Sequence, residues 1–178
     1  LSSAAKEYMK VYGVLVGKKP LIFTNNDSGY ETAIEFKKNG VNPLILDTRK
    51  EPSSDIITEA KNLGIEIKYS YVVVAAKGYK KVKSADIAKI SDNKKDLSNI
   101  ENIECDCVCV SGFWTPSIHL ASQSGNKSEF NEKIDAFIPK KSKQKENTIG
   151  SANGKFTLEE TINAVSYTHL TLPTKPSG

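Results

Sequence analysis

The sequence predicts an α/β fold built on a Rossmann-like parallel sheet, with an antiparallel β-hairpin or meander inserted into it. Two apolar stretches, 19–25 and 42–48, flank an amphipathic stretch at 28–39, which is the order strand, helix, strand. Because a helical crossover joins parallel neighbours, the two strands are expected to be parallel. A tight polar turn connects the first strand directly to its helix, as in βαβ units that bind a ligand at the strand ends.

Apolar residues at helical spacing predict three further helices. The first occupies residues 1–12 and ends at Gly13, and the second occupies 51–63. The third begins near Thr157 and is expected to stop at 164, where the composition changes. The remaining residues, 165–178, resemble translated sequencing-adapter sequence and are left out of the fold prediction.

The remaining strands follow from apolar runs and from alternation. Residues 65–69 continue the parallel sheet, and 71–76 with 82–90 predict an exposed antiparallel hairpin. The polar stretch 91–102 predicts a loop. Residues 105–110 are expected to return to the core as a strand.

The turn after the first strand departs from the glycine fingerprint G-x-G-x-x-G/A of dinucleotide-binding proteins. There the first glycine permits the turn, the second lets the backbone approach the pyrophosphate, and the third lets the helix pack on the strand. Thr24, Asn26 and Gly29 occupy these places, so only the third glycine is kept. Asparagine tolerates left-handed backbone, but its side chain crowds a bound phosphate, which predicts weak affinity. A βαβ unit that binds nothing is the alternative.

Two helix starts carry the spacing of a capping box, which leaves the first N–H groups of a helix facing an anion. Ser28 and Glu31 form the first, directly after the turn. Thr157 and Glu160 form the second, after the small-residue turn 150–154. The second box is either another anion site or an ordinary capped helix.

Asp47 ends the second strand about 20 residues after the turn, where dinucleotide folds place the acid that holds the adenosine ribose. A carboxylate there repels the 2′-phosphate of NADP, so Asp47 favours NAD. The nearby Arg49 keeps NADP as an alternative.

Cys105, Cys107 and Cys109 alternate along one apolar run and are expected to line one face of its strand. We interpret them as buried small side chains in a reducing compartment rather than as a metal site, because no C-x-x-C pair or flanking histidine accompanies them. Further along, Trp114 either stacks on a cofactor or fills a core edge, and His119 has no partner set nearby.

Composition argues against several partners. The net charge of +4 comes from scattered lysines, and Arg49 is the only arginine, whereas nucleic-acid binders cluster basic residues and favour arginine. The basic run 140–145 is interpreted as a loop. No apolar stretch approaches the roughly 20 residues that span a bilayer, and no signal peptide is recognisable, although the sequence begins with Leu1 rather than methionine.

Over residues 1–164 the chain resembles the α subunit of heterotetrameric sarcosine oxidase. The matching segments are Tyr12-Gly-Val, Phe23-Thr-Asn-Asn-Asp-Ser-Gly-Tyr30, Cys105-Asp with Val110-Ser-Gly-Phe-Trp-Thr-Pro116, His119-Leu-Ala-Ser-Gln-Ser-Gly125, and Ala152-Asn-Gly-Lys-Phe156. The replacement of the glycine loop by Phe-Thr-Asn-Asn-Asp-Ser is rare, which makes the combination specific.

The resemblance implies a two-dinucleotide flavoprotein whose NAD-binding domain is inserted into an FAD-binding domain. Residues 1–18 would form a connecting helix from the FAD domain, 19–136 the NAD-binding domain, and 137–164 the return, with only a partial FAD site in this sequence. The implied cofactor-binding residues are Thr24, Asn25, Asn26, Asp27, Ser28 and Gly29 at the pyrophosphate, Asp47 with the adjoining Thr48 and Arg49 at the adenosine ribose, Ser111, Gly112 and Trp114 near the nicotinamide, and Asn153 and Gly154 near FAD.

The implied reaction is the oxidative demethylation of sarcosine to glycine in a cytoplasmic complex with β, γ and δ subunits. Oxygen is reduced to hydrogen peroxide, and the methyl carbon passes to tetrahydrofolate. Sarcosine is oxidised in the β subunit, so no catalytic residue is expected in this stretch. The alternatives are an NADH-dependent flavoprotein reductase of the thioredoxin-reductase class and, because Asn25 and Asn26 replace glycine, a structural domain without nucleotide.

Overall fold

The structure is a computed structural model that describes residues 1–90, 97–112, 114–134, 136–140, 142, 144 and 146–170. The chain divides into two compact units, Leu1–Phe113 and Trp114–Gly178. The boundaries expected for the cofactor domains, at 18/19 and 136/137, stay predictions.

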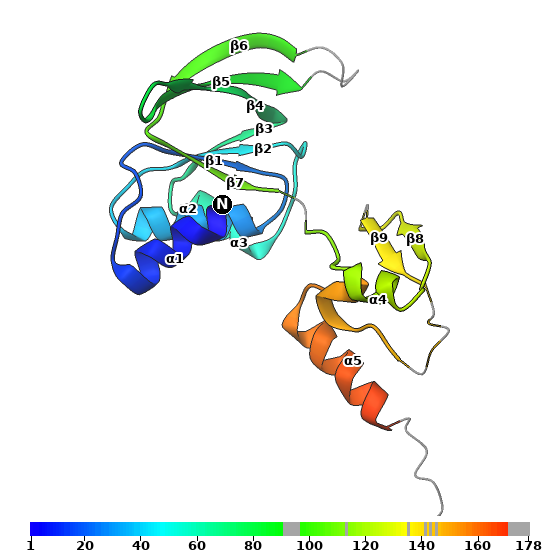
Figure 1. Cartoon of the computed structure of the whole chain (residues 1–178). Helices are drawn as coiled ribbons and strands as arrows, with labels where there is room; N and C mark the ends of the chain where they lie inside the picture. The colour runs from blue at the N-terminus through cyan, green and yellow to red at the C-terminus, as the bar shows by residue number, and fades with distance from the viewer. Residues whose placement is uncertain are drawn as a thin grey trace, which may run out of the picture. The chain divides into compact units, whose positions relative to one another are not determined.

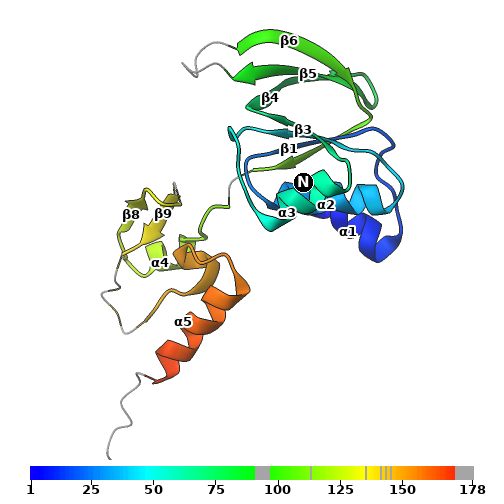
Figure 2. The same ribbon diagram turned by 180° about the vertical axis from the view of Figure 1, so that it is seen from behind.

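The first unit has three layers, with a four-stranded parallel sheet in the middle (Figure 1). Its strand order is β3-β2-β1-β7. The strands are β1 (Pro20–Thr24), β2 (Leu44–Asp47), β3 (Glu66–Tyr69) and β7 (Cys107–Ser111). Helices α1 (Ser2–Tyr12), α2 (Ser28–Lys38) and α3 (Asp55–Asn62) cover one face. The second sheet, β4 (Tyr71–Gly78), β5 (Val82–Ile90) and β6 (Leu97–Glu104), covers the other, as the view from behind also shows (Figure 2).

The order of the parallel sheet brings three polar residues together. β1 lies between β2 and β7, and all three strands run in the same direction. Thr24 pairs in register with Asp47 on one side and with Ser111 on the other. Because each is the last residue of its strand, the three side chains lie at one level of the carboxyl edge.

Alternation along β1 divides the core into two clusters. Ile22 faces the helices and packs with α2 residues such as Phe36, whereas Leu21 faces the antiparallel sheet and packs with Ile87 of β5. All four side chains are at most 1% exposed. α1 ends at Gly13, whose φ of 62° is the left-handed conformation that glycine adopts at helix ends, as expected.

Two strand predictions needed correction. Residues 97–102 of the predicted loop belong to strand β6, and residues 91–96 of the same prediction lie outside the described residues. The hairpin is not exposed either, since Ala85, Ile87 and Ala88 of β5 are fully buried. β6 supplies the third strand that allows β5 to be central and to cover the second face of the parallel sheet.

The expectation that three thiols line one strand face is wrong. Cys107 and Cys109 share the helix-side face of β7, and their Sγ atoms are 3.6 Å apart. Cys105 precedes the strand and packs in the opposite cluster, beside Leu21. The alternation of side chains is interrupted between Cys105 and Cys107, where the chain bends at Asp106. The Asp106 carboxylate accepts the N–H groups of Lys18 and Lys19 at 2.8 Å each. Among the described residues, no group of three or more His, Cys, Asp or Glu is placed to hold a metal ion.

The second unit contains short elements and one longer helix. They are α4 (His119–Gln123), β8 (Ser128–Asn131) paired antiparallel with β9 (Ala136–Pro139), the 3-10 turn η1 (Gly150–Asn153) and α5 (Leu158–Leu170). The capping box at Thr157 is confirmed, since the Glu160 N–H donates to Thr157 Oγ1 at 3.2 Å and the Thr157 N–H donates back to Glu160 Oε2 at 3.4 Å. α5 passes residue 164, contrary to expectation, because neither glycine nor proline interrupts the sequence before Pro173.

In the part of the chain that the structure describes, no helix is both long enough and apolar enough to span a bilayer.

Candidate functional site

The turn that follows β1 is closed by its own side chains. Thr24 Oγ1 accepts the Asn26 N–H at 3.2 Å and donates to the Asn26 carbonyl at 2.7 Å. The Thr24 side chain is buried, so this pair of bonds is sheltered from water. In the fingerprint, the first glycine permits this turn because its backbone is unrestricted. Here a threonine stabilises the turn by hydrogen bonds instead.

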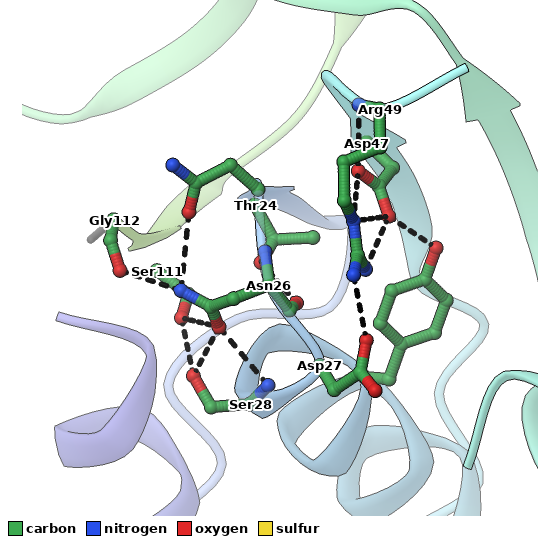
Figure 3. Close-up of polar contacts among 10 residues, drawn as sticks. Thr24, Asn26, Asp27, Ser28, Asp47, Arg49, Ser111 and Gly112 are labelled. Atoms are coloured by element: carbon green, nitrogen blue, oxygen red, sulfur yellow. Dashed lines mark hydrogen bonds and ion pairs between the residues drawn. The ribbon is translucent and has the colours of Figure 1, made fainter. Parts of the chain in front are cut away.

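Asn26, in the place of the second glycine, connects the turn to β7 (Figure 3). Its Oδ1 atom accepts the Ser28 N–H at 3.0 Å and the Ser28 hydroxyl at 2.7 Å. Its Nδ2 atom donates to the Gly112 carbonyl at 2.6 Å and to Asn25 Oδ1 at 3.1 Å. The side chain thus lies where the fingerprint leaves open backbone, and it uses one N–H of the first helical turn that an anion could otherwise bind.

Gly29, the one retained glycine, is required by close packing. A Cβ atom at this position would lie 2.6 Å from both Cβ and Oγ1 of Thr24. The first turn of α2 therefore approaches β1 as closely as the third fingerprint glycine allows. This role was predicted from the sequence, and the geometry confirms it.

The predicted capping box at Ser28 is not formed. Asp27 is the N-cap residue of α2 and makes no side-chain cap hydrogen bond, while Ser28 is already helical. The Ser28 hydroxyl contacts Ser111 Oγ at 2.6 Å. Glu31 pairs with Lys6 of α1 rather than returning to the helix start. The long-range partners on α1 and β7, which the sequence does not reveal, compete successfully for both side chains.

Asp47 lies at the predicted strand end, but its carboxylate is fully buried. Oδ2 accepts the Tyr30 hydroxyl at 2.6 Å and Arg49 Nη2 at 2.8 Å, and Oδ1 accepts the Arg49 N–H at 2.9 Å. Burial and the hydrogen bond to Asp47 raise the pKa of Tyr30 above its ordinary value. Direct contact between Asp47 and a ribose requires Arg49 to move aside, so the ribose role of Asp47 stays a prediction.

Tyr30 ends one of the segments that carry the sequence resemblance, but the resemblance implies no role for it. Its hydroxyl is buried with the Asp47 carboxylate, and a buried tyrosine needs such a partner. In the sequence, Tyr30 is recognisable only as an aromatic residue on the first turn of a helix that is expected to be buried. This position does not reveal that its hydroxyl pairs with Asp47.

Arg49 bridges the two strand-end loops. Its Nη1 atom lies 2.9 Å from Asp27 Oδ1, and its Nη2 atom lies 2.8 Å from Asp47 Oδ2 (Figure 3). Burial alone disfavours the cation, but the two carboxylates outweigh it and raise the pKa of Arg49 above its ordinary value. Arg49 therefore stays charged, with 32% of its side chain exposed.

The structure gathers most of the predicted site residues at one edge. The turn 24–29, the strand end 47–49 and the strand end 111–112 all lie at the carboxyl edge of the parallel sheet. The Thr48 N–H donates to the Thr24 carbonyl at 3.0 Å, which holds two of these segments together. Nothing lies within 4 Å of a Cβ built on Gly112, so there is space beside its Cα atom for an approaching ligand.

The other predicted residues belong to the second unit. Trp114 lies against Phe156, with ring centroids 6.0 Å apart. Gly154 has φ 73°, and a Cβ there would lie 2.6 Å from Ile134 Cδ1. Asn153 lines a cavity of about 180 Å³ together with residues that include Ser142 and Glu146. The role of these residues beside a cofactor stays a prediction. His119 is exposed.

Comparison with known proteins confirms the resemblance inferred from the sequence. No family model matches the chain. The chain is 26% identical over 168 residues to a sarcosine oxidase α subunit of Corynebacterium sp. strain P-1, and 30% identical over 139 residues to that of Rhizobium meliloti strain 1021. These matches cover 93% and 78% of this chain, but the chain spans only 17% and 13% of the length of the relatives.

Solved structures confirm the predicted fold class. Thioredoxin reductase from Lactococcus lactis matches with a TM-score of 0.62 and 15% identity, over 82% of this chain and 48% of that chain. The flavoprotein disulfide reductase RclA from Escherichia coli matches with a TM-score of 0.63 and 14% identity, over 90% of this chain and 37% of that chain. At these identities the likeness concerns the fold alone.

Proposed function

We propose that the chain is part of a sarcosine oxidase-like flavoprotein oxidoreductase, and that its first unit binds NAD at the carboxyl edge of the parallel sheet. The observation that carries the proposal is the common register of Thr24, Asp47 and Ser111 at three adjacent strand ends, directly before α2. Parallel α/β sheets bind ligands at this edge. The curated relatives named sarcosine oxidase supply the larger function.

The residues at this edge fit a dinucleotide, except that one side chain competes with the diphosphate for a hydrogen-bond donor. Gly112 leaves space beside its Cα atom, and Gly29 lets α2 begin close to the strand. However, Asn26 accepts the Ser28 N–H, so a diphosphate must compete with a side chain for a donor of the helix start. NAD would supply a hydride acceptor, whereas the residues of this chain bind and orient it. We therefore expect weak binding, with a Kd of micromolar to millimolar magnitude.

The test is calorimetric titration of the full 178-residue chain with NAD, repeated with Asn25→Asp. The substitution is isosteric, and the Asn25 side chain accepts a hydrogen bond from Asn26 Nδ2, which a carboxylate preserves. The added negative charge beside the diphosphate is expected to weaken binding about tenfold. Asn42→Asp is the matched control, because Asn42 is exposed on the approach to β2 and accepts from Lys37.

Absence of binding heat from NAD and NADH would refute the proposal and favour a structural domain without nucleotide. Equal losses from Asn25→Asp and Asn42→Asp would place the nucleotide elsewhere.

The larger assignment includes FAD beside the second unit, β, γ and δ partner subunits, sarcosine as the substrate and a cytoplasmic location. It is tested on the complete oxidoreductase. Bleaching of the flavin by sarcosine supports it. Bleaching by NADH alone supports the NADH-dependent reductase instead.

A further inference from the structure

Asp27 and Asp47 hold Arg49 from two sides. Its Nη1 atom is 2.9 Å from Asp27 Oδ1, and its Nη2 and Nε atoms are 2.8 and 3.2 Å from Asp47 Oδ2. The planar guanidinium binds anions through pairs of parallel N–H groups. At Arg49 one edge of this fork is occupied by Asp47, and Nη1 is directed to Asp27.

The charges in this cluster leave no attraction for a further anion. Arg49 contributes one positive charge, whereas Asp27 and Asp47 contribute two negative charges. Asp47 alone would neutralise Arg49 and still leave Nη1 as a free donor. Asp27 makes the cluster net negative and holds Nη1 in an ion pair, so it acts against any phosphate that approaches the end of β2.

The fold itself places little demand on the Asp27 carboxylate. It makes no cap hydrogen bond, and its side chain is 44% exposed. The Tyr30 N–H, which an N-cap side chain could accept, donates to the Asp27 backbone carbonyl instead, at 3.0 Å. A carboxylate at this point also opposes binding of a diphosphate, and the ion pair with Arg49 offsets this charge only in part, because Arg49 also pairs with Asp47.

We propose that Asp27 determines nucleotide specificity by occupying Arg49, so that the site accepts a dinucleotide with a free ribose 2′-hydroxyl and rejects one with a 2′-phosphate. This inference rests on the proposed NAD function. The sequence resemblance implies that Asp27 contacts the pyrophosphate. In this proposal Asp27 instead positions Arg49. The specificity then comes from two acids on different loops, Asp27 after β1 and Asp47 at the end of β2.

The experiment measures the Kd of NAD and of NADP for the full chain, as purified, by calorimetry at low and at physiological salt. Asp27→Asn removes the charge and keeps the size, and it is expected to improve NADP binding relative to NAD about tenfold. Glu31→Gln is the matched control, because it removes one charge from the same helix but on the side that pairs with Lys6. The ratio of the two Kd values should not change in that variant.

A double variant tests the route through Arg49. In an Arg49→Gln background, Asp27→Asn should change the ratio less than it does alone, because the freed donor is absent and only the loss of a negative charge remains. An unchanged ratio in Asp27→Asn alone, with NAD still binding, would overturn this inference and leave the proposed function standing. Failure of the unaltered chain to bind either nucleotide would instead refute the proposed function.

Discussion

Gly29 shows how a single residue sets the distance between a helix and a strand. Alanine there would place its methyl group 2.6 Å from Thr24 Cβ, and the buried Thr24 side chain cannot move away without breaking its bonds to the turn. We expect Gly29→Ala to lower the free energy of unfolding by about 1–3 kcal/mol, measured by urea denaturation.

Gly112→Ala is the control for this substitution. It lies at the same edge, and a Cβ there meets nothing within 4 Å. If both variants lost equal stability, close packing of α2 on β1 would not explain the retained glycine.

At this scale the sequence predicted positions better than orientations. Asp47 and Ser111 were placed correctly at strand ends, because hydrophobic patterning fixes where a parallel strand stops. The partners of Asp47 could not be predicted, since Tyr30 reaches it only when α2 packs beside β2, and the two-residue spacing of Arg49 does not fix the direction of its side chain. The Ser28 capping box failed for the same reason, because Lys6 and Ser111 come from distant parts of the chain.

At the scale of the element, β7 places two thiols side by side, and this gives a testable pH dependence. The hydrogen bond between Cys109 and Cys107 lowers the pKa of Cys107 to about 7, while the same contact, together with burial, raises the pKa of Cys109. The pair therefore loses its first proton near pH 7, mainly from Cys107. The rate of alkylation of Cys107 by iodoacetamide should rise through a midpoint near pH 7, as followed by mass spectrometry.

Cys109→Ala removes the hydrogen-bond donor, so the midpoint for Cys107 should move up toward the ordinary thiol pKa of about 8.5. Cys105 is an internal reference, because burial raises its pKa. An unchanged Cys107 midpoint in Cys109→Ala would show that the neighbouring thiol is not the cause.

The elements also differ in how well the sequence predicts them. The βαβ unit and α3 have clear periodicity, and each was found within a few residues of its predicted bounds. β6 was missed because its sequence, Leu-Ser-Asn-Ile-Glu-Asn-Ile-Glu, is largely polar, as suits a strand at the edge of a sheet. β6 is recognised as a strand by its antiparallel pairing with β5, which the periodicity of its sequence does not indicate.

The whole molecule consists of two compact units, and this division predicts independent unfolding. Ile87 is fully buried between the two sheets of the first unit, so Ile87→Ala should cost that unit about 2–5 kcal/mol. Far-UV circular dichroism is dominated by this unit, because most of the strands and helices belong to it. Trp114 is the only tryptophan, and its contact with Phe156 makes its fluorescence a probe of the second unit.

We therefore expect Ile87→Ala to lower the thermal midpoint seen by circular dichroism by roughly 10 °C and to leave the midpoint of Trp114 fluorescence unchanged. Val74→Ala in the same antiparallel sheet is the control, because Val74 is 41% exposed and its truncation should shift neither midpoint by more than a few degrees. Equal shifts of both signals in Ile87→Ala would instead mean that the chain unfolds as one cooperative unit. In that case, the effect of substitutions at the carboxyl edge of the parallel sheet would also depend on the stability of residues 114–178.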